Sequence, residues 1–375
     1  MMDEHMYEDA DAGVESERRL ATVQEIVAVE PIPGADRIER VVVLGWECVS
    51  QKGDFKPGDK CCYFEINSIL PPHAVFDFMA DRKYRVRTIK FRGQVAQGLA
   101  MPLNVMEKAF NLPPMKIGAN LTGLIGVLKY DPQAVKERGL STSKPDPWIV
   151  KQFMHYAWFR WLRKALRPNK GGWPSFISKT DEERVQNMPR VAQRNAGEFC
   201  YITEKLDGQS ATFGWKGRHF YVCSRNIRLY KPDTSNYWKI VKQLDLKAKL
   251  KRMRGYIIQG EILGSNIQGN KYGLAIGEHH LYVYNVFNTN TGRKLGYDER
   301  GAFLAELGLN PVPLINGCFV LDADMTVADF VELSNGKSLV QPGLTREGIV
   351  IRSMDDRLSF KSVSPDFLLE YGDDR

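Results

Sequence analysis

The stretch EKLDGQS, at residues 204–210, combines a lysine, an aspartate and a glycine at a spacing that could carry chemistry. It lies between EFCYITEKL and SATFGW, two segments whose β-branched and aromatic residues predict strands. An Asp-Gly pair is an ordinary turn former, so a surface hairpin turn is one interpretation of Asp207 and Gly208. The other interpretation is that Lys205 is a nucleophile whose neighbours position a nucleotide.

A lysine needs help to act as a nucleophile, because its amine ordinarily titrates with a pKa of about 10.4 and is protonated at neutral pH. Nearby cations or a bound metal favour the neutral amine. The predicted downstream strands supply suitable groups, in the order Arg225, Glu261, Tyr284, Glu347 and Lys361. A guanidinium, an aromatic ring, two carboxylates and a second lysine are the parts needed to hold ATP and Mg²⁺ around an attacking amine.

Other familiar nucleotide and metal motifs are missing from the sequence. GSNIQGNK at 264–271 approaches a P-loop but lacks the adjacent Gly-Lys-Ser/Thr, and no G-x-G-x-x-G follows a predicted strand. The neighbouring His279 and His280 would point to opposite sides of a strand, and no metal-ligand spacing accompanies them. We therefore expect both histidines to be structural or to lie at the surface.

The folded part of the chain is more basic than its formal net charge of +7 suggests. Residues 1–19 hold seven acidic side chains against Arg18 and Arg19, which leaves 50 basic and 38 acidic side chains elsewhere, a net charge of +12. A basic globular body suggests a polyanionic partner, nucleic acid first. The acidic tail is expected to be a flexible extension.

Composition also bounds the location and the size of the protein. No run approaches eighteen apolar residues and the N-terminus is acidic, so neither a membrane span nor a secretory signal is predicted. The six cysteines contain no C-x-x-C, which supports neither a zinc ribbon nor a disulfide framework. We expect an intracellular protein, cytoplasmic or nuclear, whose 375 residues form two domains.

Short strands separated by turn residues fill the chain from Leu20 to about Ile125 and predict a small barrel or sandwich. One of these strands, from Tyr84 to Arg92, is strongly basic. On an OB-type barrel it would follow a phosphate backbone, but an ordinary solvated edge strand would have the same composition. The candidate RNA contacts are Arg85, Arg87, Lys90 and Arg92.

A linker is expected at 141–147, and the basic, aromatic-rich segment that follows it, about 148–170, has helical spacing. A helix docked on a domain is the simpler interpretation, and contact with nucleic acid is the alternative. From about Trp173 strand signals recur, with helical stretches at about 236–253, 298–307 and 326–334. This pattern predicts an α+β domain of mainly antiparallel strands.

Six motifs in chain order resemble those of one superfamily. EKLDG, SRN, GE, YVYNV, EGIVIR and SFKSV resemble motifs I, Ia, III, IIIa, IV and V of the covalent nucleotidyltransferases, which include polynucleotide ligases and mRNA capping enzymes. The upstream FISKTDEERVQNMP resembles the Naegleria- and Deinococcus-type branch of ATP-dependent RNA ligases, in which an OB domain precedes the nucleotidyltransferase domain. The resemblance is strong over about 174–372 and weaker over the barrel, and it disfavours the hairpin interpretation of EKLDGQS.

The resemblance implies a three-step reaction that needs ATP and Mg²⁺ or Mn²⁺. Lys205 would attack the α-phosphorus of ATP, forming lysyl-AMP and releasing pyrophosphate. AMP would then pass to an RNA 5′-phosphate, and the 3′-hydroxyl would attack that adenylylated end, form the phosphodiester and expel AMP. The implied partner is RNA, as a nicked duplex or as RNA ends to be repaired, and we expect a monomer.

The resemblance also implies a role for each motif residue. Arg225 would contact the ribose, Tyr284 would stack on adenine, and Glu204 would lie beside the base. The carboxylates expected to hold the hydration shell of the metal are Asp207, Glu261 and Glu347.

The phosphates would be contacted by cations. Lys361 would bind the α-phosphate, and Arg184, with Lys179, would engage the β- and γ-phosphates or pyrophosphate. Motif V of ligases commonly reads K-x-K, whereas Ser359 and Val363 stand at the two partner positions here. Either Lys361 acts alone or another cation replaces its partner.

We therefore expect a flexible tail at 1–19, an OB domain at 20–125, a linker with a basic helix at 126–173, and a nucleotidyltransferase domain at 174–375. Within the enzyme class, the alternatives are a capping-type guanylyltransferase and a DNA ligase. Both usually carry their OB domain after the motifs, whereas the barrel precedes them here. A non-catalytic nucleic-acid-binding protein with a degenerate nucleotidyltransferase fold is the alternative outside that class.

Overall fold

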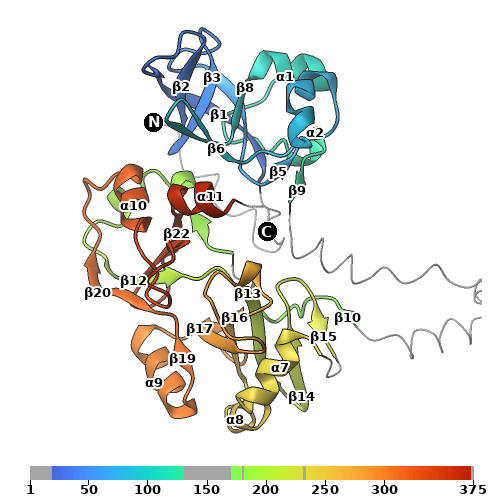
Figure 1. Ribbon diagram of the computed structural model, residues 1–375, viewed down its shortest axis with the longest axis vertical. Helices are drawn as coiled ribbons and strands as arrows, with labels where there is room; N and C mark the ends of the chain where they lie inside the picture. Colours follow the sequence, from blue (N-terminus) through green and yellow to red (C-terminus); the bar gives the residue numbers. More distant parts are fainter. Residues whose placement is uncertain (1–18, 131–169, 180, 231–233, 373–375) are drawn as a thin grey trace, which may run out of the picture. The chain divides into compact units, whose positions relative to one another are not determined.

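The computed structural model describes residues 19–130, 170–179, 181–230 and 234–372. The chain divides into two compact units, Met1–Tyr130 and Asp131–Arg375 (Figure 1). The expected tail, apart from Arg19, and most of the expected linker with its basic helix lie outside the described residues. No helix among the described residues is long and apolar enough to cross a membrane.

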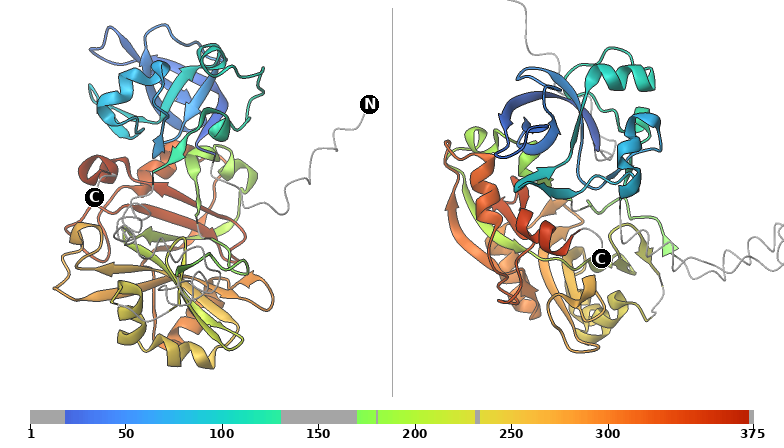
Figure 2. Two further views of the ribbon diagram at one scale, coloured as in Figure 1. Left: turned by 90° about the vertical axis from the view of Figure 1, so that its right-hand side faces the viewer. Right: turned by 45° about the horizontal axis from the view of Figure 1, so that its top comes forward.

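The first unit is a curled antiparallel sheet, as predicted for an OB-type barrel (Figure 2). Its main sheet has the strand order β3-β2-β1-β4-β8. A register shift between Ile26 and Ala28 bends β1, which pairs with β4 from Ala21 to Glu25 and with β2 from Ile26 onward. The strands are β1 Ala21–Pro31, β2 Ile38–Val43, β3 Trp46–Gln51, β4 Lys60–Phe64, β5 Ser68–Ile69, β6 Thr88–Phe91, β7 Gln94–Gln97, β8 Leu99–Pro102 and β9 Leu128–Lys129.

Helices close one side of the barrel and complete its apolar core. They are η1 Ala74–Arg82, α1 Leu103–Phe110 and α2 Thr122–Ile125. Phe76 of η1 packs edge-on against Phe64 of β4, with ring centroids 5.5 Å apart, and both rings are fully buried. Met106 of α1 joins the same cluster, so the inner face of the curled sheet and the helices share one core.

The basic segment 84–92 is a strand only over β6 (Thr88–Phe91). Arg85 lies before it and is buried: its Nη2 donates to Asn67 Oδ1 at 2.8 Å, and its guanidinium lies 3.4 Å from the centre of the Tyr130 ring. This corrects the expectation that Arg85 faces nucleic acid, because its partners lie inside its own domain. The remaining candidates lie at or near the surface, namely Arg87, Lys90 and Arg92.

The second unit is an α+β domain built on two sheets, as predicted. The larger sheet has the order β10-β15-β14-β13-β16-β17-β18, with β19 beside β17, and the smaller has the order β11-β22-β21-β12-β20. The first strands are β10 Lys170–Gly171, β11 Glu183–Arg184, β12 Phe199–Lys205, β13 Gln209–Lys216, β14 His219–Cys223, β15 Arg228–Leu229 and β16 Tyr256–Gly264. The others are β17 His279–Asn288, β18 Arg293–Lys294, β19 Asn310–Pro311, β20 Leu314–Val320, β21 Gly348–Ser353 and β22 Ser359–Val363.

Three helices pack on one face of the larger sheet (Figure 1). They are α7 Asn236–Gln243, α8 Leu246–Arg252 and α9 Tyr297–Leu307. The expected single helical stretch at 236–253 is two helices, because Asp245 adopts a left-handed φ of 48° between them. The remaining helices of this unit are η2 Val185–Asn187, α6 Val191–Arg194, η3 Gln268–Asn270, α10 Val327–Ser334 and α11 Pro365–Tyr371.

Gly348, at the start of β21, permits the close approach of β22. Its φ is 156°, and a Cβ atom there would lie 2.2 Å from the carbonyl oxygen of Ser362. We expect Gly348→Ala to destabilise the domain by about 1–3 kcal/mol, because the strands must separate to admit the methyl group. A shift of the urea midpoint checks this. Gly343→Ala is the control, since nothing lies within 4 Å of its Cβ position; equal midpoints for the two variants would contradict the argument.

Candidate active site

Lys205 lies at the end of β12, where the register pairs it with Gly348 of β21. This pairing brings the lysine beside Glu347, the residue before that strand. Lys205 Nζ donates to Glu347 Oε1 at 2.5 Å, and the two side chains are 24% and 15% exposed. Two residues that are 142 positions apart in sequence are thus a contact pair.

The stretch EKLDGQS crosses from one sheet to the other and is not a hairpin. β12 belongs to the smaller sheet and β13 to the larger one, and the two strands do not pair. At the crossing, the backbone N–H of Gly208 donates to Glu261 Oε1 on β16 at 3.1 Å. A Cβ atom on Gly208 would lie 2.5 Å from the carbonyl oxygen of Ile262, so the close approach requires glycine. The glycine of K-x-D-G is therefore required where the chain passes from the smaller sheet to the larger one.

Three carboxylates surround Lys205, and their mutual repulsion adds to the cost of burying them. Burial raises the pKa of Glu261 to about 8; Lys205 opposes the rise, while Glu347 and Asp207 add to it. Burial likewise raises the pKa of Glu347, against the effect of Lys205. Among the described residues, no group of three or more His, Cys, Asp or Glu side chains lies close enough to hold a metal ion directly.

Asp181 connects two of the expected nucleotide-binding cations. Its Oδ1 accepts from Lys361 Nζ at 2.8 Å, and its Oδ2 accepts from Arg225 Nη2 at 3.1 Å. The sequence analysis did not single out Asp181, although the quoted segment FISKTDEERVQNMP contains it. Arg184 lies on β11 and pairs in parallel register with Lys361 of β22, so these two cations are also neighbours.

The expected base-binding residues lie on both sheets. Tyr284 is on β17, and its hydroxyl lies 3.0 Å from Ser210 Oγ on β13. Glu204, on β12 beside Lys205, is buried, and its Oε2 accepts from the backbone N–H of Leu339 at 2.8 Å. Burial raises the pKa of this carboxyl. Lys179, the second cation expected at the β- and γ-phosphates, is exposed.

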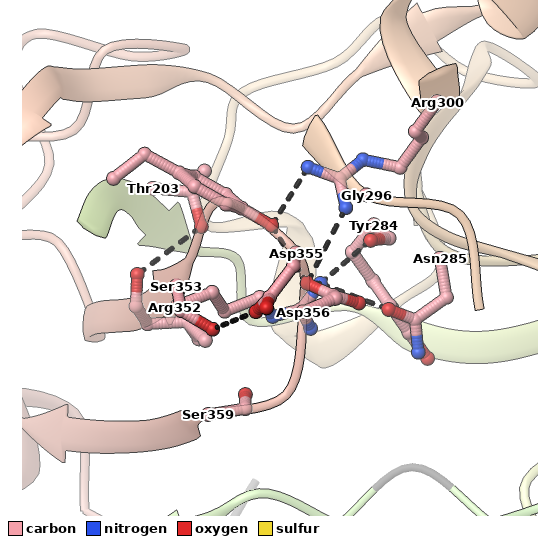
Figure 3. Close-up of polar contacts among 12 residues, drawn as sticks. Thr203, Tyr284, Asn285, Gly296, Arg300, Arg352, Ser353, Asp355, Asp356 and Ser359 are labelled. Carbon is pink, nitrogen blue, oxygen red and sulfur yellow. Dashed lines mark hydrogen bonds and ion pairs between the residues drawn. The ribbon is translucent and has the colours of Figure 1, made fainter. Parts of the chain in front are cut away.

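Arg352, on β21, lies at the centre of a buried polar network that ties the two sheets together (Figure 3). Its Nη1 donates to Tyr284 O at 2.7 Å and to Asn285 Oδ1 at 2.8 Å, both on β17. Burial opposes the charge, but Glu182, 2.8 Å away, raises the pKa of Arg352 above its usual value. Asp356 lies 3.9 Å from the same guanidinium. Sequence reasoning missed this role, although Arg352 ends the quoted EGIVIR.

Both units match known families. Residues 198–364 match the family model described as RNA ligase, and residues 20–103 match one described as an OB-fold domain. No curated protein sequence matches the chain significantly.

The Naegleria gruberi RNA ligase has the same fold in several solved forms. A lysine-to-alanine mutant with ATP and Mn is 30% identical, over 93% of this chain and 98% of its own, with a TM-score of 0.78. The form with PPi is 29% identical, over 96% and 100%, with a TM-score of 0.79. An aspartate-to-alanine mutant without ligand is 29% identical, over 95% and 99%, with a TM-score of 0.79.

Substitutions in these and related forms replace, in chain order, an arginine, a lysine, an aspartate, a glutamate and a lysine. Their separations along that chain equal the separations here between Arg184, Lys205, Asp207, Glu347 and Lys361.

The fold and the lysine-centred site together define a covalent nucleotidyltransferase with an OB domain in front of it. Within that class, the chain belongs to the RNA ligase family, in the branch with an N-terminal OB domain.

The raised pKa of Glu261 predicts a pH-dependent stability in the absence of divalent metal. Between its ordinary value of 4.5 and about 8, the folded state holds a proton that the unfolded state has lost. Stability therefore falls as pH rises through this window. Glu261→Gln has no such proton, so its melting temperature should exceed that of the wild type by more at about pH 8.5 than at about pH 5. Parallel pH profiles of the two proteins in EDTA would contradict this.

Proposed function

We propose that this chain is an ATP-dependent RNA ligase that joins RNA 3′-hydroxyl and 5′-phosphate ends through lysyl-AMP and RNA-adenylate intermediates, as in nick sealing during RNA repair. The observation that carries the proposal is the contact of Lys205 Nζ with Glu347 at the point where the chain crosses between the sheets. An amine held at such a crossing faces groups from both sheets. The larger sheet carries the expected adenine platform Tyr284, and the smaller sheet carries the cation Lys361.

In the first step, Lys205 Nζ forms a bond to the α-phosphorus of ATP, and the bond from that phosphorus to the bridging oxygen breaks. Pyrophosphate leaves with the electron pair. Lys361 and Arg184, neighbours across β22 and β11, would stabilise the negative charge on the phosphates. Asp181 pairs with Lys361 in the structure, so its carboxylate would give way to phosphate there. Glu347 orients the amine through the contact at 2.5 Å.

The three carboxylates around Lys205 fit a hydrated divalent cation. Glu347 Oε2 is buried and has no hydrogen-bond partner among the described residues, and the pKa of Glu261 is raised by its burial and by neighbouring carboxylates. A positive charge would relieve both features. Mg²⁺ usually keeps several of its waters, so carboxylates too far apart for direct ligation can still hold it through water. Asp207, Glu261 and Glu347 would hold that shell, and the ion would supply charge neutralisation at the α-phosphate.

The second and third steps need RNA. A 5′-phosphate oxygen attacks the phosphorus of lysyl-AMP and releases Lys205; the 3′-hydroxyl then attacks the 5′-phosphorus and AMP leaves. The OB domain is the proposed RNA-binding element, through Lys90 and Arg92, with Arg87 as a half-buried neighbour. The basic body of the chain, with its net charge of +12 outside residues 1–19, supports a polyanionic substrate.

Replacing Lys205 tests the covalent step directly. Lys205→Met should abolish formation of the AMP adduct while leaving the fold intact, because only an amine can form the phosphoramidate. Lys205→Arg should fail as well, since a guanidinium is not deprotonated in proteins. Labelled ATP with Mg²⁺ followed by denaturing electrophoresis measures the adduct. An adduct that survives in Lys205→Met and maps to another lysine would overturn the assignment, and labelling by GTP instead of ATP would favour a capping-type enzyme.

Cutting the chain near Ser141 should separate chemistry from RNA binding. The C-terminal part keeps every motif from Lys179 to Lys361, so it should still form lysyl-AMP. It should lose nick sealing, because the reacting ends would no longer be held together and the advantage of effective concentration would vanish. Sealing of a labelled nicked RNA duplex, compared with a matched DNA nick, measures this.

Two results would contradict the division of labour. A truncated protein that seals nicks as well as the full chain would make the barrel structural or regulatory. A truncated protein that folds, by circular dichroism, but forms no adduct would place part of the chemistry in the barrel. In the full chain, neutralising Lys90 and Arg92 should weaken RNA binding and flatten its salt dependence.

A further inference from the structure

The loop between β16 and β17 contains GSNIQGNK, the segment that approaches a P-loop in sequence. Gln268, Gly269 and Asn270 adopt left-handed φ values of 47°, 70° and 53° in succession. Non-glycine residues are uncommon in this region, and such strain concentrates at functional loops. The Asn270 side chain secures the turn: its Nδ2 donates to Leu274 O at 3.0 Å and its Oδ1 accepts from Leu274 N at 2.9 Å. The direction of the next residue, Lys271, is fixed by this turn.

Lys271 reaches Asp207, two residues after Lys205. Its Nζ forms an ion pair with Asp207 Oδ2, and only 8% of the lysine side chain is exposed. The neighbouring Tyr272 accepts with its hydroxyl from the backbone N–H of Asp207 at 3.0 Å. One loop therefore holds both the carboxylate and the backbone of Asp207.

The ammonium of Lys271 lies against two aromatic rings of the C-terminal helix α11. It lies 4.6 Å from the centre of the Phe367 ring and 5.2 Å from that of Tyr371, within cation–π range of both. The helix also begins at the pocket: the backbone N–H of Ser364, its N-cap, donates to Glu347 O at 2.9 Å. The helix α11 is thus linked to the carboxylate of Asp207 through Lys271, and its N-cap residue Ser364 is bonded to the backbone of Glu347.

We propose that Lys271 is a positioning residue for the adenylylation reaction, which holds Asp207 in place beside Lys205 and couples it to the packing of α11. This rests on the proposed function of Lys205. The physical reason is charge: Asp207, Glu261 and Glu347 repel one another, and a carboxylate with no counter-ion would turn away from the others. Lys271 supplies that counter-ion from a rigid loop. It engages only Oδ2 of Asp207, which leaves Oδ1 for the hydration shell of the metal.

Two variants of Lys271 separate positioning from simple packing. Lys271→Met keeps the length and apolar stem but removes the charge, and Lys271→Arg restores the charge. In single-turnover adenylylation with labelled ATP, the maximal rate of Lys271→Met should fall about 10- to 100-fold while KM for ATP changes little. Lys271→Arg should recover most of the rate. Lys251→Met, an exposed lysine of α8, is the matched control and should behave like wild type.

A double-mutant comparison shows whether Lys271 acts through Asp207. If it does, Lys271→Met should add little further loss in an Asp207→Asn background, where the carboxylate is already gone. Wild-type rates in Lys271→Met, or losses that multiply with those of Asp207→Asn, would overturn the proposal. So would equal losses in Lys271→Met and Lys271→Arg with a loss of melting temperature in both. Phe367→Leu is a milder variant, because it removes one aromatic contact of Lys271 and keeps the lysine. Its maximal rate should fall less than that of Lys271→Met.

Hydrogen exchange gives a readout that does not depend on activity. Amides of α11 (Pro365–Tyr371) should exchange faster in Lys271→Met than in wild type or Lys251→Met, because the helix loses its charged partner. Unchanged protection in Lys271→Met would refute the coupling to α11. If the wild-type protein forms no AMP adduct, the proposed function fails, whereas a normal wild-type adduct with an unimpaired Lys271→Met rejects only the role of Lys271.

Discussion

The site around Lys205 depends on one buried guanidinium, that of Arg352, which joins the two sheets of the second unit. Arg352 extends from β21 of the smaller sheet to the backbone of Tyr284 on β17 of the larger sheet, and to Glu182 before β11. A buried charge that loses its partners costs about 3–5 kcal/mol, so these acceptors must come together for the fold to be stable. Arg352 therefore links the strand that carries the proposed adenine platform Tyr284 to β21, which Glu347 directly precedes.

A second constraint is the excess of carboxylates around the nucleophile. Lys205 pairs with Glu347 and Lys271 pairs with Asp207, whereas Glu261 accepts from the backbone of Gly208. The pKa of Glu261 is the one raised to about 8. Each of these carboxylates disfavours the charge of its neighbours, so a cation that enters with the substrate gains from that excess. The carboxylates that would favour binding of this cation therefore lower the stability of the folded protein when the cation is not bound, as is common at functional sites.

Much of this architecture could be predicted from sequence, because strand-forming segments and motif order are local signals. The strands β12 and β13 and the helix α10 are where the pattern placed them. Short strands such as β11 were missed, since two residues carry no periodicity, yet β11 places Arg184 beside Lys361. The roles of Asp181 and Lys271 could not be predicted either: each depends on contacts with residues 44 to 180 positions away, which spacing does not reveal.

Motif V of this chain has one lysine where ligases commonly have two, and the short strand β11 lies beside it. Ser359 and Val363 cannot supply a second cation to the face of β22 that carries Lys361. Parallel pairing with β11 sets Arg184 directly opposite Lys361, so the neighbouring strand carries a second cationic residue beside that lysine. We infer that Arg184 and Lys361 serve the phosphates together, with only one lysine on β22. The planar guanidinium of arginine, with its five N–H donors, also matches phosphate oxygens better than the ammonium of lysine does. The single lysine of SFKSV is therefore consistent with a working phosphate site.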